Sequence, residues 1–548
     1  MKIKINKILW GYAFLIVGLA YFFGLFIDLT GDSGLYAAIS RQMVESGDWF
    51  NLSINGEPYD QKPHLFFWLA GFGIKLFGNN NFAFKLFPFL YGLLGIYFTY
   101  RLGKQIFSNK VGKLAALIAG TSQISFLYFF DFHTDTVLQT GVVLALWQLA
   151  AYLQKKKVEN FVLGFLGIGL AMLSKGPIGA ILAFFAVLLF LLGKKDFRQL
   201  FHPKWILGIL IVLIVISPSL IHLYNSFGFE GLKFYFITNN IGRITGEYAG
   251  SSSDPFFYLH TLLWAVLPWT IFVAGAIVFE IKSWVIKKEN NIWGVYLLGS
   301  VLIFVLILSI AKGKAPNYFF IAIPAVSVVT ASWAAHFTEI SKRMQMFFIR
   351  SQIIIISLLG LLFIFLAIVF VLDAVWLPIA IFVFSTSAIF IGVKTQLEKK
   401  NISFLVSVII IGSLNLLLNT KVFPDLYKYQ GARQVLEIFE KNAEKGDRLY
   451  NFELEEYEMF FYAKDSVNEI EDWNELREVI IKPGTWIYTN STKQKDFIKM
   501  KFEFDAVYEI PQRGMNRINL KFLNPQTRKN SLKSNYLFVT SKKEKEII

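Results

Sequence analysis

Long apolar runs recur along this chain from Ile8 to Thr420, and they constrain the fold more than any other feature. Several, such as Trp205 to Ile221 and Ile353 to Leu372, approach the roughly 20 residues that a helix needs to cross about 30 Å of hydrocarbon. Of the 548 residues, 55% are hydrophobic and only 17% are charged. The sequence therefore predicts a membrane all-α protein that crosses the bilayer many times.

Short basic clusters separate the apolar runs, and their order predicts the topology. If Met1 to Lys7 is cytoplasmic, clusters such as Lys155 to Lys157 and Lys194 to Lys204 fall at every second helix end. This pattern predicts about 13 transmembrane helices in a bacterial inner membrane, with the loop after Ile27 and the C-terminus on the extracytoplasmic side. It also explains the formal net charge of +15 without a nucleic-acid partner.

The hydropathy falls after Lys421, where the pattern of a small α/β domain begins. Periodicity predicts helices over Ala432 to Ala443 and Ile470 to Glu478, and strands over Asp447 to Phe452 and Thr485 to Thr489. We therefore expect a transmembrane domain over residues 1–420 and an extracytoplasmic α/β domain over residues 421–548.

Several function classes are disfavoured by what the sequence lacks. The chain has no cysteine, which excludes disulfides, thiolate catalysis and cysteine-bound metal, and its six histidines are scattered. It contains neither a P-loop nor a Rossmann glycine fingerprint, which disfavours a nucleotide-driven pump or a cytosolic synthase. A lipid-linked substrate could instead reach a site on the extracytoplasmic side.

The polar loop from Gly31 to His64 is where we expect chemistry, because ionisable groups beside lipid are costly unless they are paired, hydrated or used. Asp32 opens an amphipathic segment and is either the N-cap of a helix lying along the membrane interface or a catalytic acid. Lys62 precedes the apolar run Leu65 to Phe77, and it either snorkels to the interface or neutralises a phosphate.

A second group of polar residues follows the apolar stretch Leu114 to Phe130. Asp131 and Asp135 are four residues apart and would share one face of a helix, with His133 between them. That spacing could bind a metal, but the ligand set is incomplete, so we expect no obligatory cofactor. Asp135 could equally orient an acceptor or pair with Lys175.

Further cations and amides stand at other extracytoplasmic helix junctions. Asn240 and Arg243 lie in the longest of these loops. Arg243 is either an ordinary solvated arginine or a guanidinium that binds a phosphate through two hydrogen bonds. Lys314 and Tyr318 lie at another junction. Cations at positions 62, 175, 243 and 314 would face the acids at 32 and 135. The cations could hold a lipid phosphate while an acid activates an acceptor, which is the least that transfer of a sugar from a polyprenyl phosphate requires.

The ordered pattern of these residues resembles a known family. The segment DSGLYAAISRQMVESGDWFNLSINGEPYDQKPH, followed in order by DFHTDTVL, GLAMLSKGP, NNIGR and KGKAPNYFFIAIP, is similar to the integral-membrane GT-C glycosyltransferases. Within them it resembles the dolichyl-phosphate-mannose protein mannosyltransferase-like group, which includes the bacterial lipid A aminoarabinose transferases. The resemblance implies a GT-C bundle and transfer, with inversion, from a polyprenyl-phosphate sugar donor to lipid A, a glycan or a protein.

The resemblance also implies roles for individual residues. Asp32 would be the catalytic acid/base, Lys62 and Arg243 would contact the donor phosphate, and Tyr36, Tyr59 and Tyr318 would line the cavity. The chain departs from the aminoarabinose enzymes at Leu35, where they have Arg, and at Gln61, where they have Glu.

A polytopic flippase or transporter of lipid-linked sugars is the alternative. Such a protein would also need many helices and polar groups within the membrane. The sequence shows no inverted repeat, and its polar groups cluster on one side. These features favour the transferase.

Overall fold

The computed structural model describes residues 2–246, 252, 254–286, 291–370, 381, 383, 385–386, 399–470, 472–513, 520–524 and 526–540. Within them, eight helical stretches are long and apolar enough to cross a membrane: Asn6–Gly24, Asn81–Ile106, Thr134–Lys155, Val158–Lys175, Phe197–Gly242, Ile292–Ile310, Lys342–Phe370 and Asn401–Tyr427. The protein is therefore a polytopic helical membrane protein, as the apolar runs predicted.

The eight stretches correspond to single helices or to helices joined end to end. They are α1 (Lys2–Gly24), α4 (Asn81–Ile106), α7 (Thr134–Lys155), α8 (Val158–Lys175), α10 (Phe197–Leu200) with α11 (Lys204–Lys233), η1 (Phe234–Thr238) and α12 (Asn239–Thr245), α15 (Ile292–Gly294) with η2 (Val295–Gly299) and α16 (Ser300–Ile310), α19 (Lys342–Phe370), and α21 (Lys399–Leu417) with η3 (Leu418–Val422) and α22 (Phe423–Tyr427). Shorter helices pack among them: α5 (Asn109–Thr121), α6 (Gln123–Tyr128), α9 (Ile178–Gly193), α13 (Phe257–Ala265), α14 (Thr270–Val285), α17 (Asn317–Phe320) and α18 (Ile323–Ala335). The predicted total of about 13 crossings stays a prediction, since few residues between 371 and 398 are described.

Helices α7 and α8 cross closely at the centre of the bundle because small residues line their contact. A side chain at Gly141 of α7 would meet the backbone nitrogen of Ala171 at 2.6 Å, and one at Gly167 of α8 would meet the backbone nitrogen of Ala145 at 2.6 Å. Small residues at such a crossing let two helix backbones approach in a membrane. The crossing fixes the start of α7 beside the end of α8, where Asp135 and Lys175 stand.

The loop after α1 folds into α2 (Asp32–Ser46), a short hairpin of β1 (Ser53–Ile54) and β2 (Glu57–Pro58), and α3 (Leu65–Phe77), the last as predicted. Ile39 and Met43 of α2 are buried, so the predicted apolar face exists. A helix of the C-terminal region packs on α2, and the expectation that α2 lies along the membrane interface stays a prediction.

The C-terminal region forms a five-stranded sheet in the order β4-β3-β5-β7-β6, where β3 pairs in parallel with β4 and β5 and the other pairs are antiparallel. Its elements are α23 (Gly431–Asn442), β3 (Arg448–Phe452), α24 (Glu458–Tyr462), β4 (Val467–Ile470), α25 (Trp473–Ile480), β5 (Thr485–Asn490), α26 (Ser491–Lys499), β6 (Ala506–Gln512), α27 (Leu520–Leu523), η4 (Lys529–Ser531) and β7 (Lys533–Val539). The helix predicted over Ile470 to Glu478 is wrong at its start, because Ile470 ends a strand and α25 begins at Trp473. The boundary proposed after residue 420 falls within a helical stretch that runs on to Tyr427.

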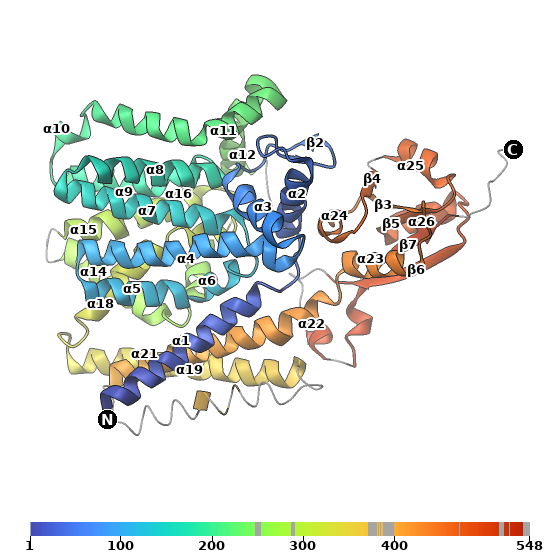
Figure 1. Cartoon of the computed structure of the whole chain (residues 1–548). Helices are drawn as coiled ribbons and strands as arrows, with labels where there is room; N and C mark the ends of the chain where they lie inside the picture. The colour runs from blue at the N-terminus through green and yellow to red at the C-terminus, as the bar shows by residue number, and fades with distance from the viewer. Residues whose placement is uncertain are drawn as a thin grey trace.

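The sheet domain lies against the end of the bundle that carries α2 and α3, whereas the N-terminus and α10 lie at the opposite end (Figure 1). The basic residues Lys194 to Lys204 surround α10, and Lys155 to Lys157 join α7 to α8. The bundle therefore separates a polar end next to the sheet domain from an end rich in lysine.

Candidate active site

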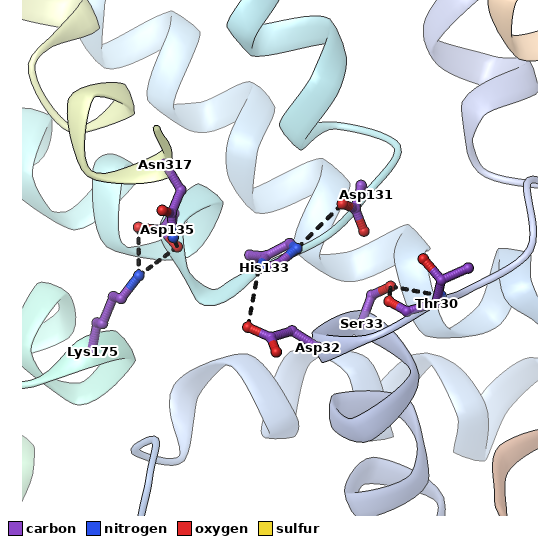
Figure 2. A network of polar contacts seen from close by, with 8 residues as sticks. All are labelled: Thr30, Asp32, Ser33, Asp131, His133, Asp135, Lys175 and Asn317. Carbon is purple, nitrogen blue, oxygen red and sulfur yellow. Dashed lines mark hydrogen bonds and ion pairs between the residues drawn. The ribbon is translucent and has the colours of Figure 1, made fainter. Parts of the chain in front are cut away.

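Asp32 is the first residue of α2, and it faces His133 across the site (Figure 2). The Oδ2 atom of Asp32 lies 3.8 Å from Nδ1 of His133, and the Asp32 side chain is 63% exposed. The N-cap is Gly31, with φ +53°, and no side chain caps the helix, so the N-cap role considered for Asp32 is wrong. The N-terminal end of a helix dipole favours a negative charge at this position.

His133 links Asp32 to a second carboxylate. Its Nε2 atom lies 3.3 Å from Oδ2 of Asp131, in the turn just before α7. The prediction that Asp131 and Asp135 share one face of a helix is wrong, because α7 begins only at Thr134. In the described part of the chain, no group of three or more His, Cys, Asp or Glu side chains is placed to hold a metal ion.

The charges of His133 and Asp131 reinforce each other. Burial alone would lower the pKa of His133, but the adjacent Asp131 carboxylate outweighs it and leaves the pKa above its ordinary 6.5. Burial alone would raise the pKa of Asp131, but His133 outweighs it and leaves the pKa below its ordinary 3.8. Both groups are therefore charged together over a wide range of pH.

We expect this pair to give the protein a pH-dependent part of its stability. The contribution of His133 is complete below its unfolded pKa and is lost as the pH rises through the raised folded pKa. The contribution of Asp131 is lost as the pH falls through its lowered pKa. The difference in melting temperature between the wild type and His133→Gln should be largest between about pH 4 and pH 6.5 and shrink above it. A difference that grows above pH 8 would contradict the pairing.

Asp135 and Lys175 form a buried ion pair next to this cluster (Figure 2). The Lys175 Nζ donates to Oδ1 and Oδ2 of Asp135 at 2.8 and 2.6 Å, and Asn317 Nδ2 donates to Oδ2 at 2.9 Å. Asp135 is fully buried, and the Lys175 ammonium lies 4.8 Å above the ring of Tyr318. Of the two roles considered for Asp135, the structure shows the pairing with Lys175.

Two adjoining cavities open beside this ion pair, and Lys62 and Lys175 line both. One encloses about 370 Å³ and the other about 700 Å³. Asn239, Asn240 and Gln61 line both as well, and Tyr318 lines the larger one. Residues far apart in the sequence thus place two of the four predicted cations, Lys62 and Lys175, and three amides around one space.

A third, apolar hollow of about 1220 Å³ lies between α8, α9 and α11. Its lining residues Met172, Ile216 and Phe236 are each three positions before a residue that lines the smaller polar cavity, namely Lys175, Ser219 and Asn239. Three positions are about one helical turn. The polar cavity therefore lies about one helical turn from an apolar groove.

The other predicted residues lie around these spaces. Lys314 Nζ donates to the carbonyl of Ser252 at 2.8 Å, and Asn240 Nδ2 donates to the carbonyl of Tyr235 at 3.0 Å. The stretch around Asn240 was expected to be a mobile loop, but η1 and α12 make it helical. Arg243 belongs to α12, and its side chain lies outside the described residues.

Tyr36 and Tyr59 are buried in an aromatic cluster. Both rings contact Phe67, at centroid distances of 5.7 and 5.9 Å, and the Tyr36 ring lies 6.2 Å from that of His133. Tyr318 thus lines the larger cavity, and Tyr36 and Tyr59, which belong to the first loop, pack against Phe67 of α3.

Two histidines that the sequence analysis did not single out also line the smaller cavity. His64 Nε2 lies 2.9 Å from the carbonyl of Phe50, and His222 Nε2 lies 2.9 Å from the carbonyl of Tyr59. A carbonyl only accepts, so both rings carry their proton on Nε2. They tie the segment that carries Lys62 to α11. In the sequence, the only signal was that His64 follows the Lys-Pro step.

Comparisons with known proteins show which sequences and which fold this chain resembles. Residues 61–222 match the family model described as dolichyl-phosphate-mannose-protein mannosyltransferase. The chain is 27% identical over 349 residues to an undecaprenyl phosphate-alpha-4-amino-4-deoxy-L-arabinose arabinosyl transferase of Yersinia enterocolitica, and 28% identical over 303 residues to an uncharacterised protein of Aquifex aeolicus. These matches cover 60% and 55% of this chain, and 60% and 58% of the relatives' own lengths.

The fold has a solved counterpart. The crystal structure of ArnT from Cupriavidus metallidurans bound to undecaprenyl phosphate aligns with a TM-score of 0.74 at 18% sequence identity. The alignment covers 96% of this chain and 98% of that one. The bundle and the small sheet domain therefore share one architecture with that structure.

Proposed function

This chain is a member of the GT-C, dolichyl-phosphate-mannose protein mannosyltransferase-like group, and from that premise we propose that it is a glycosyltransferase. Its donor is a sugar linked to a polyprenyl phosphate, and its acceptor is a lipid, a glycan or a protein on the extracytoplasmic side of the membrane. The relative of known structure was crystallised with undecaprenyl phosphate, a lipid of the proposed donor class.

The observation that carries the proposal is the junction of a cationic cavity with an apolar groove. A polyprenyl phosphate has a charged head and a long apolar tail. The lysines at 62 and 175 suit the phosphate, since charge-assisted hydrogen bonds to phosphate are among the stronger ones. The groove one helical turn away suits the tail.

In the proposed mechanism, the Asp32 carboxylate accepts the proton of the acceptor hydroxyl while that oxygen attacks the anomeric carbon. The bond from the anomeric carbon to the phosphate oxygen breaks, and the configuration inverts. The polyprenyl phosphate leaves with its new charge held by Lys62 and Lys175, which line the same cavities. Arg243 is proposed to help hold the same phosphate.

His133 has a supporting part in this mechanism. Its positive charge, stabilised by Asp131, lies 3.8 Å from the Asp32 carboxylate and attracts it to this place in the site. We also propose that no divalent metal is needed, because the lysines supply the positive charge at the leaving group.

The orientation in the membrane is part of the proposal. The site opens at the end of the bundle next to the sheet domain, and the lysine-rich connections lie at the other end (Figure 1). By the positive-inside rule, the lysine-rich end faces the cytoplasm. Donor, acceptor and sheet domain would then meet on the extracytoplasmic side of a bacterial inner membrane.

Replacing Lys62 with methionine tests the phosphate site. A hydrogen bond to a charged group contributes about 1.5–3 kcal/mol, so the affinity for polyprenyl phosphate should fall roughly ten- to a hundredfold. The affinity can be measured by titrating the purified protein with a fluorescent polyprenyl phosphate. Lys75→Met is the matched control, because Lys75 is exposed at the far end of α3. Equal affinity of Lys62→Met and the wild type would refute the assignment.

A further inference from the structure

Four polar side chains form a network between the end of α1, the start of α4 and the sheet domain: Asp28, Asn81, Arg433 and Tyr462. Arg433 Nη2 and Asn81 Nδ2 both donate to Oδ1 of Asp28, at 2.5 and 2.8 Å. Tyr462 Oη donates to Oδ1 of Asn81 at 2.7 Å. The guanidinium of Arg433 stacks 3.9 Å from the centroid of the Tyr462 ring. The sheet domain thus meets the bundle through a connected polar network.

The network reaches the backbone just before the catalytic aspartate. The N–H of Leu29 donates to Tyr462 Oη at 2.7 Å, three residues before Asp32. In the same turn, the hydroxyl of Ser33, the residue after Asp32, donates to the carbonyl of Thr30 at 2.9 Å and accepts from its N–H at 3.2 Å. Burial raises the pKa of Tyr462, so its hydroxyl keeps the proton that it donates. One phenol oxygen therefore fixes the chain where it turns into α2.

Helix α24 also packs directly on α2. A side chain at Gly34 would meet the backbone nitrogen and Cβ of Glu458 at 3.0 Å, so the lack of a side chain at Gly34 lets Glu458 approach α2 closely. Further along α2, Arg41 Nη1 donates to the carbonyls of Phe460, Phe461 and Ala463 at the end of α24. These carbonyls would otherwise lack partners at the helix end.

We infer that the sheet domain is a working part of the transferase site, in which Tyr462 is a positioning residue that sets Asp32 through the backbone at Leu29. The inference rests on the proposed function. Asp32 touches the acceptor, whereas Tyr462 acts only through the chain that carries Asp32. A displacement of about 1 Å in a catalytic group can lower the rate a hundredfold, so a modest shift of α2 is enough to matter.

The test replaces Tyr462 with phenylalanine, which keeps the ring and its stacking on Arg433 but removes the hydroxyl. We expect kcat to fall at least tenfold while KM for the polyprenyl-phosphate sugar changes less than twofold, because the lysine cavity is untouched. Hydrogen exchange of the peptide over residues 25–36 should become at least tenfold faster. Tyr508→Phe is the control, since its ring stacks on Trp486 within the sheet domain.

A second variant disturbs the same contact between α2 and the sheet domain at a different residue, so the test does not depend on Tyr462 alone. Arg41→Met removes the bonds to α24 from the opposite end of α2 and should also lower kcat without raising KM. If either variant shows unchanged turnover with unchanged exchange, or a rise in KM that matches the loss in kcat, the inference is overturned. If the wild type transfers no sugar, the proposed function fails. Faster hydrogen exchange in Tyr462→Phe would then show that Tyr462 only anchors the structure, and the inference that it positions a catalytic residue would be overturned.

Discussion

The Lys175→Met protein is expected to be less stable than the wild type by about 3–5 kcal/mol, the cost of leaving a buried charge without its partner. Asp135 is fully buried, and the Lys175 ammonium bonds both of its oxygens. Without the lysine, Asn317 is the remaining partner among the described contacts, and an amide cannot neutralise the carboxylate. The free energy of unfolding in detergent, from denaturant titration, measures the effect.

A double variant and a matched single variant separate pairing from other losses. Lys175→Met combined with Asp135→Asn removes both charges and should recover a large part of the lost stability. Lys233→Met is the control, because Lys233 also ends a helix and pairs with Glu230, but that pair is exposed. It should cost less than about 0.5 kcal/mol. Equal losses in Lys175→Met and Lys233→Met would contradict the buried pair.

The second large effect concerns Asp32. Replacing it with asparagine should lower kcat by roughly 10²–10⁴-fold, the usual contribution of a general acid or base. The side chain is 63% exposed, so the stability of the folded protein should change by no more than about 0.5 kcal/mol. Glu57→Gln is the control, since Glu57 is an exposed carboxylate of β2 in the same loop.

The pair of variants distinguishes catalysis from a general effect of charge in the first loop. Asp32→Asn should bind polyprenyl phosphate as tightly as the wild type, because Asp32 takes no part in holding the phosphate. Full transfer activity in Asp32→Asn would remove it from the mechanism, and an equal loss in Glu57→Gln would show that the charge of the loop, and not the position of Asp32, matters.

The sequence predicted what depends on local pattern. The apolar run Leu65 to Phe77 is a helix with those bounds, and the strand at Thr485 begins where it was expected. The predicted helix started too early, at Ile470. This residue ends β4, and only two residues separate it from α25, so the sequence pattern does not mark where the strand stops and the helix begins. It also missed β6, whose alternating burial reflects pairing with β7 alone.

The candidate site shows the same division. Charge beside apolar runs was enough to single out Lys62 in the first loop and Lys175 at another helix junction, and both line the same cavities. The contact between Asp32 and His133, and the bond from Leu29 to Tyr462 across 433 positions, depend on how distant elements pack. A single sequence carries no local signal for such pairs.

The most direct test of the proposed function uses the purified protein in liposomes with a polyprenyl-phosphate sugar radiolabelled in the sugar, together with acceptors extracted from a bacterial envelope. The prediction is that the label leaves the lipid and appears on an acceptor, with one polyprenyl phosphate released for each sugar transferred. Label that remains on intact lipid while that lipid crosses between leaflets would contradict the transferase and identify a flippase.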